Sequence, residues 1–424
     1  MAETQEAVAP EFVPSAEFLA RDKRVSDAVQ LKQPDRIPLI MGAGYYLAEM
    51  GGFSKQTLYD DFEASQAMLE KAALLYEPDM IFGAWHTPEP SRILGDRMTK
   101  WPGLGLDEGG SFQFNEQEFM KAADYDAFIE DPGDWTIRVY TPRAFANCEG
   151  LALLPPLGMF AYGYYNVFNY PVLTAPPVVA AFETIYKAAQ AQVAWLEESL
   201  VSAARLAELG FPPFVMLANI CEAPFDFMSD TLRGMRGIFL DMLRIPDKLL
   251  AAEEKVGRFQ VEHIKNAVQA NNIPHVFIPL HRGSDGFMSL AQFEKFYWPQ
   301  LKEMILAFID AGITPWVYYE GVWNDRLEYL AELPKGKSVG MFQDSDIFKV
   351  KDVVGDTLCI LGGMPIPMLK NGTPESVRAY TKRLCEEVGR DGGFIMSTSV
   401  LELEGCNPEL IEAWTNATHE FGAY

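Results

Sequence analysis

The stretch Thr314-Pro315-Trp316-Val317-Tyr318-Tyr319-Glu320-Gly321 decides the fold class of this chain. A short apolar and aromatic run is followed at once by a carboxylate and a glycine. A run of this length, bounded by turn-forming residues, is typical of a strand that is buried on both faces. The residue directly behind such a strand lies where a parallel sheet presents its polar groups.

Similar runs recur along the whole sequence. They lie at residues 37–41, 80–85, 213–218, 275–280, 338–342, 357–361 and 393–396. Helical patterns separate several of them, at 57–75, 290–311 and 374–388, and the last pattern opens with Thr373 as N-cap and Pro374 at the first helical position. Alternating strands and helices predict an α/β fold with a parallel sheet, and eight strands are the number that closes a (β/α)8 TIM barrel.

The domain organisation follows from the absence of a Gly/Ser-rich or Pro-rich linker. We predict one domain over residues 1–424, with an N-terminal helical arm at 1–36. The distance between the second and third strands predicts a long insertion, residues 86–212, that covers the barrel mouth.

Composition excludes several classes of protein. Of the 424 residues, 59 are acidic and 35 basic, and a net charge of −24 argues against binding to nucleic acid. A hydrophobic content of 49% excludes intrinsic disorder, and no apolar stretch is long enough to predict a membrane span. Five scattered cysteines and an acidic N-terminus without basic residues favour a cytoplasmic protein with free thiols.

Polar residues cluster just behind the predicted strands. The third run is followed by Asn219, Cys221 and Glu222, the fourth by His281, Arg282 and Asp285, the fifth by Glu320, the sixth by Asp344 and Asp346, and the eighth by Ser397, Thr398 and Ser399. Side chains at strand ends converge in a barrel, so we expect a catalytic set of His281, Glu320, Asp285 and Asp344. Glu320 in a plain salt bridge, His281 as a merely hydrogen-bonded residue, and the Asp344–Asp346 segment as a helix cap are the structural alternatives.

Aromatic residues supply the expected substrate contacts. Tyr318 and Tyr319 directly precede Glu320, and Phe160, Tyr162 and Tyr164 belong to the aromatic, glycine-rich segment 158–170 inside the insertion. Such a segment can line a pocket for a flat organic ligand or plug one mouth of the barrel.

The order of several motifs resembles the uroporphyrinogen decarboxylase superfamily over nearly the whole chain. The matching segments are Gln33–Pro38, Tyr76–Asp79, Ala223–Asp226 with Leu232–Gly234, Asp285–Ser289, Leu361–Pro365 and Asn371–Glu375. The resemblance implies a single (β/α)8 barrel. It also implies one of two activities: porphyrinogen decarboxylation, or zinc-dependent methyl transfer to or from a corrinoid cofactor.

Departures from the family pattern separate these branches. The decarboxylases resembled here carry an Arg-Gln-Ala-Gly-Arg-like stretch after the first strand, whereas this chain has Met41–Tyr46 without a positive charge. A substrate with many carboxylates would find no matching cations there. The methyltransferases resembled here carry His-x-Cys-Gly and a later Cys for zinc, whereas this chain has Tyr318–Gly321 and Ser397–Ser399. A Zn2+ site built from His281, Glu320 and Cys221 remains open.

The resemblance therefore favours a methyltransferase component that moves a methyl group from a small aromatic or apolar methyl ether to a corrinoid. The chain lacks an Asp-x-His-x-x-Gly signature, so the corrinoid is expected free or on a separate carrier protein. A homodimer is compatible with this assignment. Two alternatives are a decarboxylase or lyase that uses Asp79 and His281 on a small acid, and a non-catalytic binding subunit.

Overall fold

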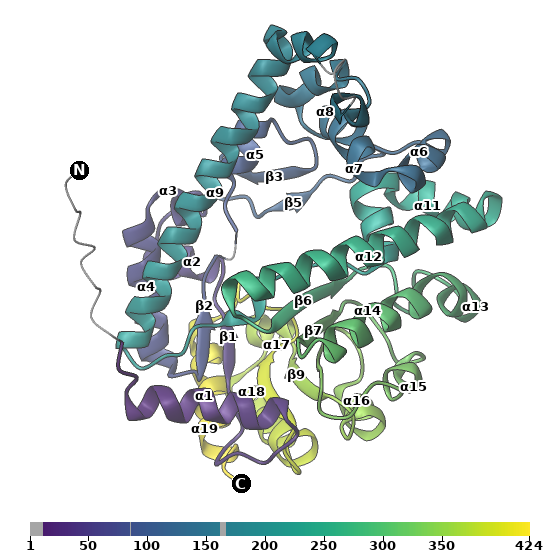
Figure 1. The fold of residues 1–424 in the computed structure, drawn as a ribbon. Coiled ribbons are helices and arrows are strands. Elements are labelled where there is room, and N and C mark those ends of the chain that lie inside the picture. The colour runs from purple at the N-terminus through teal and green to yellow at the C-terminus, as the bar shows by residue number, and fades with distance from the viewer. Residues whose placement is uncertain (1–11, 85, 162–166) are drawn as a thin grey trace.

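The protein is described by a computed structural model that covers residues 12–84, 86–161 and 167–424. Its centre is a parallel arrangement of short strands surrounded by helices (Figure 1). The five-stranded part has the order β10-β9-β8-β7-β6, and a second part pairs β1 with β2. The α/β class with a parallel sheet is thereby confirmed.

Seven of the eight predicted strands form. They are β1 (Ile40–Gly42), β2 (Met80–Phe82), β6 (His275–Leu280), β7 (Thr314–Tyr319), β8 (Val339–Phe342), β9 (Cys359–Met364) and β10 (Phe394–Thr398). A parallel bridge between Leu39 and Met396 joins β1 to β10, so that both parts continue one arrangement.

The prediction of a strand at 213–218 is wrong. This segment contains the 3-10 helix η7 (Val215–Ala218), and only the residues behind it become extended. There, Ile220 bridges to Phe277 of β6, and the backbone N–H of Cys221 donates to the carbonyl of Phe277 at 3.1 Å. Pro212 and Pro213, at the start of this segment, have no backbone N–H to donate to a neighbouring strand.

Alternating side chains divide the core into two layers. One face of the strands forms an inner core cluster, which includes Ile40, Phe277, Trp316, Met341 and Ile395. The intervening residues of the same strands join a larger cluster with the surrounding helices. A period of two along each strand therefore decides which side chains face the inside and which face the helices.

The helices that surround the strands follow the chain order. They are α2 (Tyr46–Gly51), α3 (Thr57–Asp60), α4 (Phe62–Tyr76), α10 (Pro224–Asp226), α11 (Gly234–Arg244), α12 (Pro246–Asn271), α13 (Leu290–Gln292), α14 (Trp298–Asp310), α15 (Leu327–Leu330), α16 (Ile347–Val354), α17 (Ile366–Asn371), α18 (Pro374–Arg383) and α19 (Pro408–Phe421). Thr373 caps α18 with Pro374 in its first turn, as the sequence predicts. Asp346 caps α16, which is the structural alternative given above for the segment 344–346. No helix in the described part of the chain is long and apolar enough to cross a membrane.

The N-terminal arm forms α1 (Ala16–Val29), which lies across the pole of the sheet at which the strands begin (Figure 1). Val25 and Ala28 of this helix are buried and belong to the inner core layer. Arg24 pairs with Asp35 and with Asp79, directly before β2. The arm therefore seals the N-terminal pole.

The insertion forms a lobe of its own, drawn in blue and teal in Figure 1. It contains a small sheet of β3 (Thr99–Pro102), β4 (Gly105–Leu106) and β5 (Gln113–Phe114), and the helices α5 (Glu89–Leu94), α6 (Tyr125–Glu130), α7 (Pro132–Trp135) and α8 (Thr141–Ala144). The long helix α9 (Pro176–Glu208) returns the chain toward α4.

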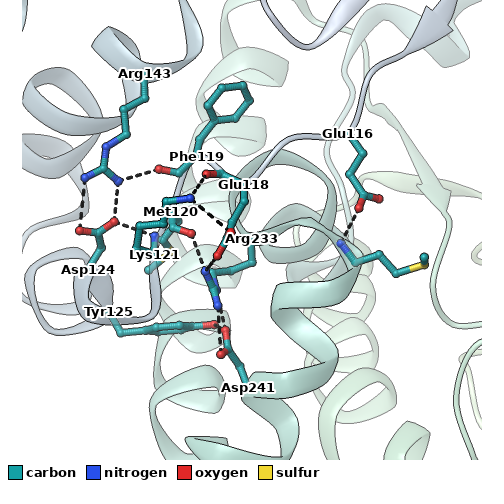
Figure 2. A network of polar contacts seen from close by, with 11 residues as sticks. Glu116, Glu118, Phe119, Met120, Lys121, Asp124, Tyr125, Arg143, Arg233 and Asp241 are labelled. Atoms are coloured by element: carbon teal, nitrogen blue, oxygen red, sulfur yellow. Dashed lines mark hydrogen bonds and ion pairs between the residues drawn. The ribbon is translucent and has the colours of Figure 1, made fainter.

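Contacts of the lobe concentrate at the opposite pole, where the strands end. Phe112 donates its backbone N–H to the Tyr45 hydroxyl behind β1, at 2.9 Å, and Ser111 bonds to Glu404 behind β10, at 2.6 Å. Figure 2 shows the tightest attachment: buried Arg233 donates to Asp241, Glu118 and the carbonyl of Met120. The lobe is thus fixed to loops around the C-terminal pole.

Candidate active site

The candidate site begins with two neighbouring strands that end side by side. In the register of β6 and β7, Leu280 lies opposite Tyr319, so the next residues on each strand, His281 and Glu320, are neighbours. Both continue the inward-facing series of their strands. His281 Nε2 lies 3.5 Å from Glu320 Oε1, and their side chains keep 31% and 34% of their surface exposed. The pair is therefore formed and can be reached by a ligand.

A second carboxylate holds the other side of the His281 ring. Asp230 Oδ2 lies 2.5 Å from His281 Nδ1, and it comes from the π-helical segment η8 (Phe227–Arg233). Wide helical turns of this kind often occur at functional sites. The imidazole is consequently clamped between carboxylates on both nitrogens.

The backbone behind β6 is fixed by a third carboxylate. Asp226 is fully buried and accepts the N–H groups of His281 at 2.9 Å and of Arg282 at 3.0 Å. The hydroxyl of Tyr297, in the first turns that lead into α14, donates to the same carboxylate at 2.6 Å. Asp226 thus positions the loop that carries His281.

These contacts decide the charge of His281. Burial lowers the pKa of the imidazole, but the hydrogen bonds to Asp230 and Glu320 and the charge of Asp226 raise it more, to about 11. The ring is therefore an imidazolium at neutral pH, with N–H groups at both nitrogens. It presents an acidic proton toward the exposed side of the site.

Two carboxyls around this cation have pKa values above their usual range. Burial and the charge of Asp230 raise the pKa of Glu222 to about 7, although His281 opposes this shift. Burial and the same neighbour also raise the pKa of Asp226. Like charges at short range and loss of water both disfavour ionisation. Glu222 and Asp226 are therefore harder to ionise than carboxyl groups in water.

A second cation links the site to the insertion. Arg282 contacts Asp230 Oδ1 at 2.7 Å and Glu116 Oε2 at 3.0 Å. Glu116, labelled in Figure 2, also accepts the backbone N–H of Met235, at 2.9 Å. Arg282 is thereby saturated by two carboxylates and is not available to bind an anionic substrate.

The far side of the pole is also acidic. Glu402, behind β10, accepts the backbone N–H groups of Tyr45 and Leu403 at 3.0 and 2.8 Å. A side chain on Gly44, which has φ +44°, would begin 1.9 Å from the Glu402 carboxylate. Lys55, a cation at this side, is paired with Glu404. The loop behind β1 therefore packs against a carboxylate at the position where the decarboxylases resembled above carry arginines.

Some of the remaining expected site residues lie beside the His281–Glu320 pair, and others do not. Tyr318 faces inward, and its pKa is raised by burial and by the charges of Glu320 and Asp344, so these three residues are near one another. Tyr319 faces the helices instead, stacked on Phe342 at a centroid distance of 4.8 Å and buried in the outer core layer. Asp285 is paired with buried Arg326 at 2.7 Å.

Three other expected residues lie away from the pair. Asp79 is fully buried at the N-terminal pole and bonded to Arg24 and Arg36. Phe160 packs in the separate core of the insertion and stacks on Tyr170. Cys221 is buried in the outer core layer. Tyr162 and Tyr164 lie outside the described residues.

The structure does not bring the three expected zinc ligands together. Of these, only His281 and Glu320 are neighbours, and the second nitrogen of His281 faces Asp230. The thiol of Cys221 is directed into the outer core. Over residues 12–84, 86–161 and 167–424, no group of three His, Cys, Asp or Glu side chains has the geometry to hold a metal.

Sequence reasoning missed Asp226 and Asp230 as site residues and passed over Glu222. Asp226 and Asp230 are four residues apart in a segment opened by Pro224, which is the spacing of one helical face. That spacing, directly behind a strand end, was an available signal.

Comparisons with known proteins agree with this architecture. The family model described as Uroporphyrinogen decarboxylase (URO-D) matches residues 156–421. The fold is similar to that of a methyltransferase from Methanosarcina mazei, with a TM-score of 0.60 and 13% sequence identity over 95% of this chain and 98% of that chain. Identity this low shows a common fold alone. No curated protein matches the sequence.

Proposed function

Because the chain belongs to the uroporphyrinogen decarboxylase family, we propose that it is a methyltransferase component of that family. We infer that it removes the methyl group from a small, uncharged methyl ether and passes it to a corrinoid acceptor. The observation that carries the proposal is the position of His281, which lies between Asp230 and Glu320 and is partly exposed to a ligand. A closed (β/α)8 barrel is part of the same proposal.

The role proposed for His281 is that of a general acid. When the methyl–oxygen bond breaks, the bonding electron pair stays on oxygen and forms an alkoxide or phenoxide. The Nε2–H of His281 would protonate that oxygen, and Glu320, at 3.5 Å, would stabilise the imidazolium before the transfer. The raised pKa keeps the proton on His281 at neutral pH, so the donor is in its acid form when the methyl–oxygen bond breaks.

The corrinoid is treated as the methyl acceptor and not as a resident group of this chain. When bound, it supplies a nucleophilic cobalt centre to which the methyl group is transferred. About a third of the side-chain surface of His281 and of Glu320 is exposed, so an acceptor from outside can reach the pair. Tyr318, beside Glu320, would provide an apolar wall for the donor.

Electrostatics support an uncharged donor. Four carboxyl groups, those of Glu222, Asp226, Asp230 and Glu320, surround His281, and Arg282 is the second cation among them. A porphyrinogen with its many carboxylates would be repelled here. The decarboxylase or lyase alternative needs Asp79 and His281 in one site. Asp79 is instead buried between arginines at the other pole.

The test is methyl transfer from a panel of methoxy compounds to cob(I)alamin, free and on a carrier protein, followed by absorbance. We expect methylcobalamin with uncharged aromatic or aliphatic ethers and none with His281→Ala. A folded protein that transfers no methyl group from any member of the panel would contradict the proposal. Carbon dioxide release from a small acid without corrinoid would instead select the lyase alternative.

A further inference from the structure

The long helix α9 carries a second apolar stripe that stays exposed in the described part of the chain. Val178, Ala181, Ala188 and Leu206 are buried and form the stripe by which the helix packs on the protein. At its C-terminal end, Arg205 pairs with Glu63 and Glu70 of α4, which fixes the same orientation. The side chains one position further along each turn lie about 100° around the helix from these contacts, on its neighbouring flank.

The exposed stripe is a heptad seam, which we define as Val179, Phe182, Tyr186, Ala189, Val193, Leu196 and Leu200. Its six large side chains are between 38% and 71% exposed. Their spacing alternates strictly between three and four residues, which is the pattern of a coiled-coil interface. A helix that packs only on its own domain has one apolar stripe, whereas α9 has two.

We infer that the heptad seam is a dimer interface and that its occupant is the α9 helix of a second copy of this chain. When two helices run antiparallel, the seam matches itself from Val179 to Leu196, and Leu200 lies beyond this overlap. Tyr186 then lies opposite Ala189 of the second copy, Phe182 opposite Val193, and Val179 opposite Leu196. The largest side chain therefore meets the smallest, as close packing requires.

The alternative parallel arrangement lacks this complementarity. It would place Tyr186 against Tyr186 and leave a gap between the two Ala189 side chains. The antiparallel arrangement also sets opposite ends of the two helix dipoles beside one another. Glu183 then flanks Gln190 of the second copy, so that no like charges face each other along the seam.

The area of the seam is close to what a stable dimer needs. Six side chains that each expose on the order of 100 Å2 offer roughly 600 Å2 per copy, against about 800 Å2 per partner in a typical interface. Each copy carries a net charge of −24, so that long-range repulsion opposes association. Salt screens this repulsion, and we expect the dimer to be tighter at 0.5 M than at 0.05 M salt.

Sedimentation velocity of the full chain tests the interface, with a matched pair of variants. Val193→Glu places a charge in the seam, and Ala194→Glu places the same charge one residue away, on an exposed position of the same helix. We expect a wild-type dimer at micromolar concentration, at least a hundredfold weaker association for Val193→Glu, and no change for Ala194→Glu. A monomeric wild type, or a dimer that both variants or neither variant dissociates, would overturn the inference.

Cysteine cross-linking tests the direction of the helices. The five native cysteines are buried, so that introduced thiols are read without background. In an oxidised mixture of two single variants, Val179→Cys and Leu196→Cys, we expect a cross-linked dimer containing one copy of each. Val179→Cys alone should stay uncross-linked, and a covalent dimer of that variant alone would show parallel helices and contradict the arrangement.

Discussion

The two poles of the sheet use the same residue types in opposite ways. At the N-terminal pole, Asp79 is fully buried, its oxygens are occupied by Arg24, Arg36 and the backbone N–H of Leu39, and charge is balanced. At the C-terminal pole, several carboxyls compete for His281 and Arg282, and the His281–Glu320 pair stays open. A saturated ion pair stabilises a fold, whereas an unbalanced and accessible cluster can carry out chemistry.

Among variants that separate the two poles, we expect the largest change in methyl transfer for His281→Ala. Removal of the proton donor should reduce methyl transfer by about 10²–10⁴-fold, while the circular dichroism and melting curve stay close to wild type. The matched control is His275→Gln at the other end of the same strand, where the ring accepts a hydrogen bond from Trp316. A comparable loss in both variants would show that the two poles do not differ in function.

The stability of the fold should depend most on the other pole. Asp79→Asn leaves two arginines beside a neutral amide, and we expect a loss of about 3–5 kcal/mol in the free energy of unfolding, measured with urea. Methyl transfer per folded molecule should not change. Asp27→Asn, which breaks the surface pair with Lys23, is the control and should cost less than about 1 kcal/mol. Equal losses in the two variants would contradict the structural role of Asp79.

Glu320 and Asp285 both belong to the catalytic set expected from the sequence. We expect their substitutions to differ in their effects on methyl transfer and on stability. Glu320→Gln removes one of the groups that raise the pKa of His281, and it should reduce methyl transfer by about 10–100-fold without unfolding. Asp285→Asn should lower the melting temperature, because Arg326 loses its partner, and leave the rate per folded molecule unchanged. The reverse pattern would place Asp285 in the reaction and Glu320 in the scaffold.

The smallest effect concerns pH. The pKa of Glu222 is raised in the folded protein to about 7 from its ordinary value of 4.5, so its proton stabilises the fold below pH 4.5, and this stabilisation is lost as the pH rises through 7. Glu222→Gln cannot ionise and should be about 1–2 kcal/mol more stable than wild type at pH 8, with no such gain at pH 4.5. Urea unfolding at both pH values measures this, and a gain that is larger at pH 4.5 would contradict the raised pKa.

Most of the fold could be predicted from sequence because short apolar runs with turn residues mark buried parallel strands. β6 and β7 have the predicted bounds. The run at 213–218 has a similar apolar composition and begins directly behind Pro212, but it contains a 3-10 helix. Composition alone does not show whether an apolar run pairs with a neighbouring strand. Successive side chains of a strand point to opposite faces, so Tyr318 and Tyr319 could not both face the site. The expected substrate contacts nevertheless included both tyrosines.

The site was only half predictable for a different reason. His281 and Glu320 are adjacent because two strands end in register, and strand ends can be read from the sequence. Asp226 and Asp230 reach the same place from a helical segment whose position depends on tertiary packing. The pairing of Asp285 with Arg326 depends likewise on a turn 41 residues further along the chain. Contacts of this kind are set by the folded structure and not by a local pattern.

The most direct test of the central claim is a titration of the His281 side chain by NMR, with ¹³C or ¹⁵N in the imidazole and His281→Ala to assign the signal. We expect an imidazolium with both nitrogens protonated that persists through pH 9, since Asp230 and Glu320 raise the pKa of His281. A ring that is neutral at pH 7.5, or that titrates near 6.5 like a solvent-exposed histidine, would contradict the proposed proton donor.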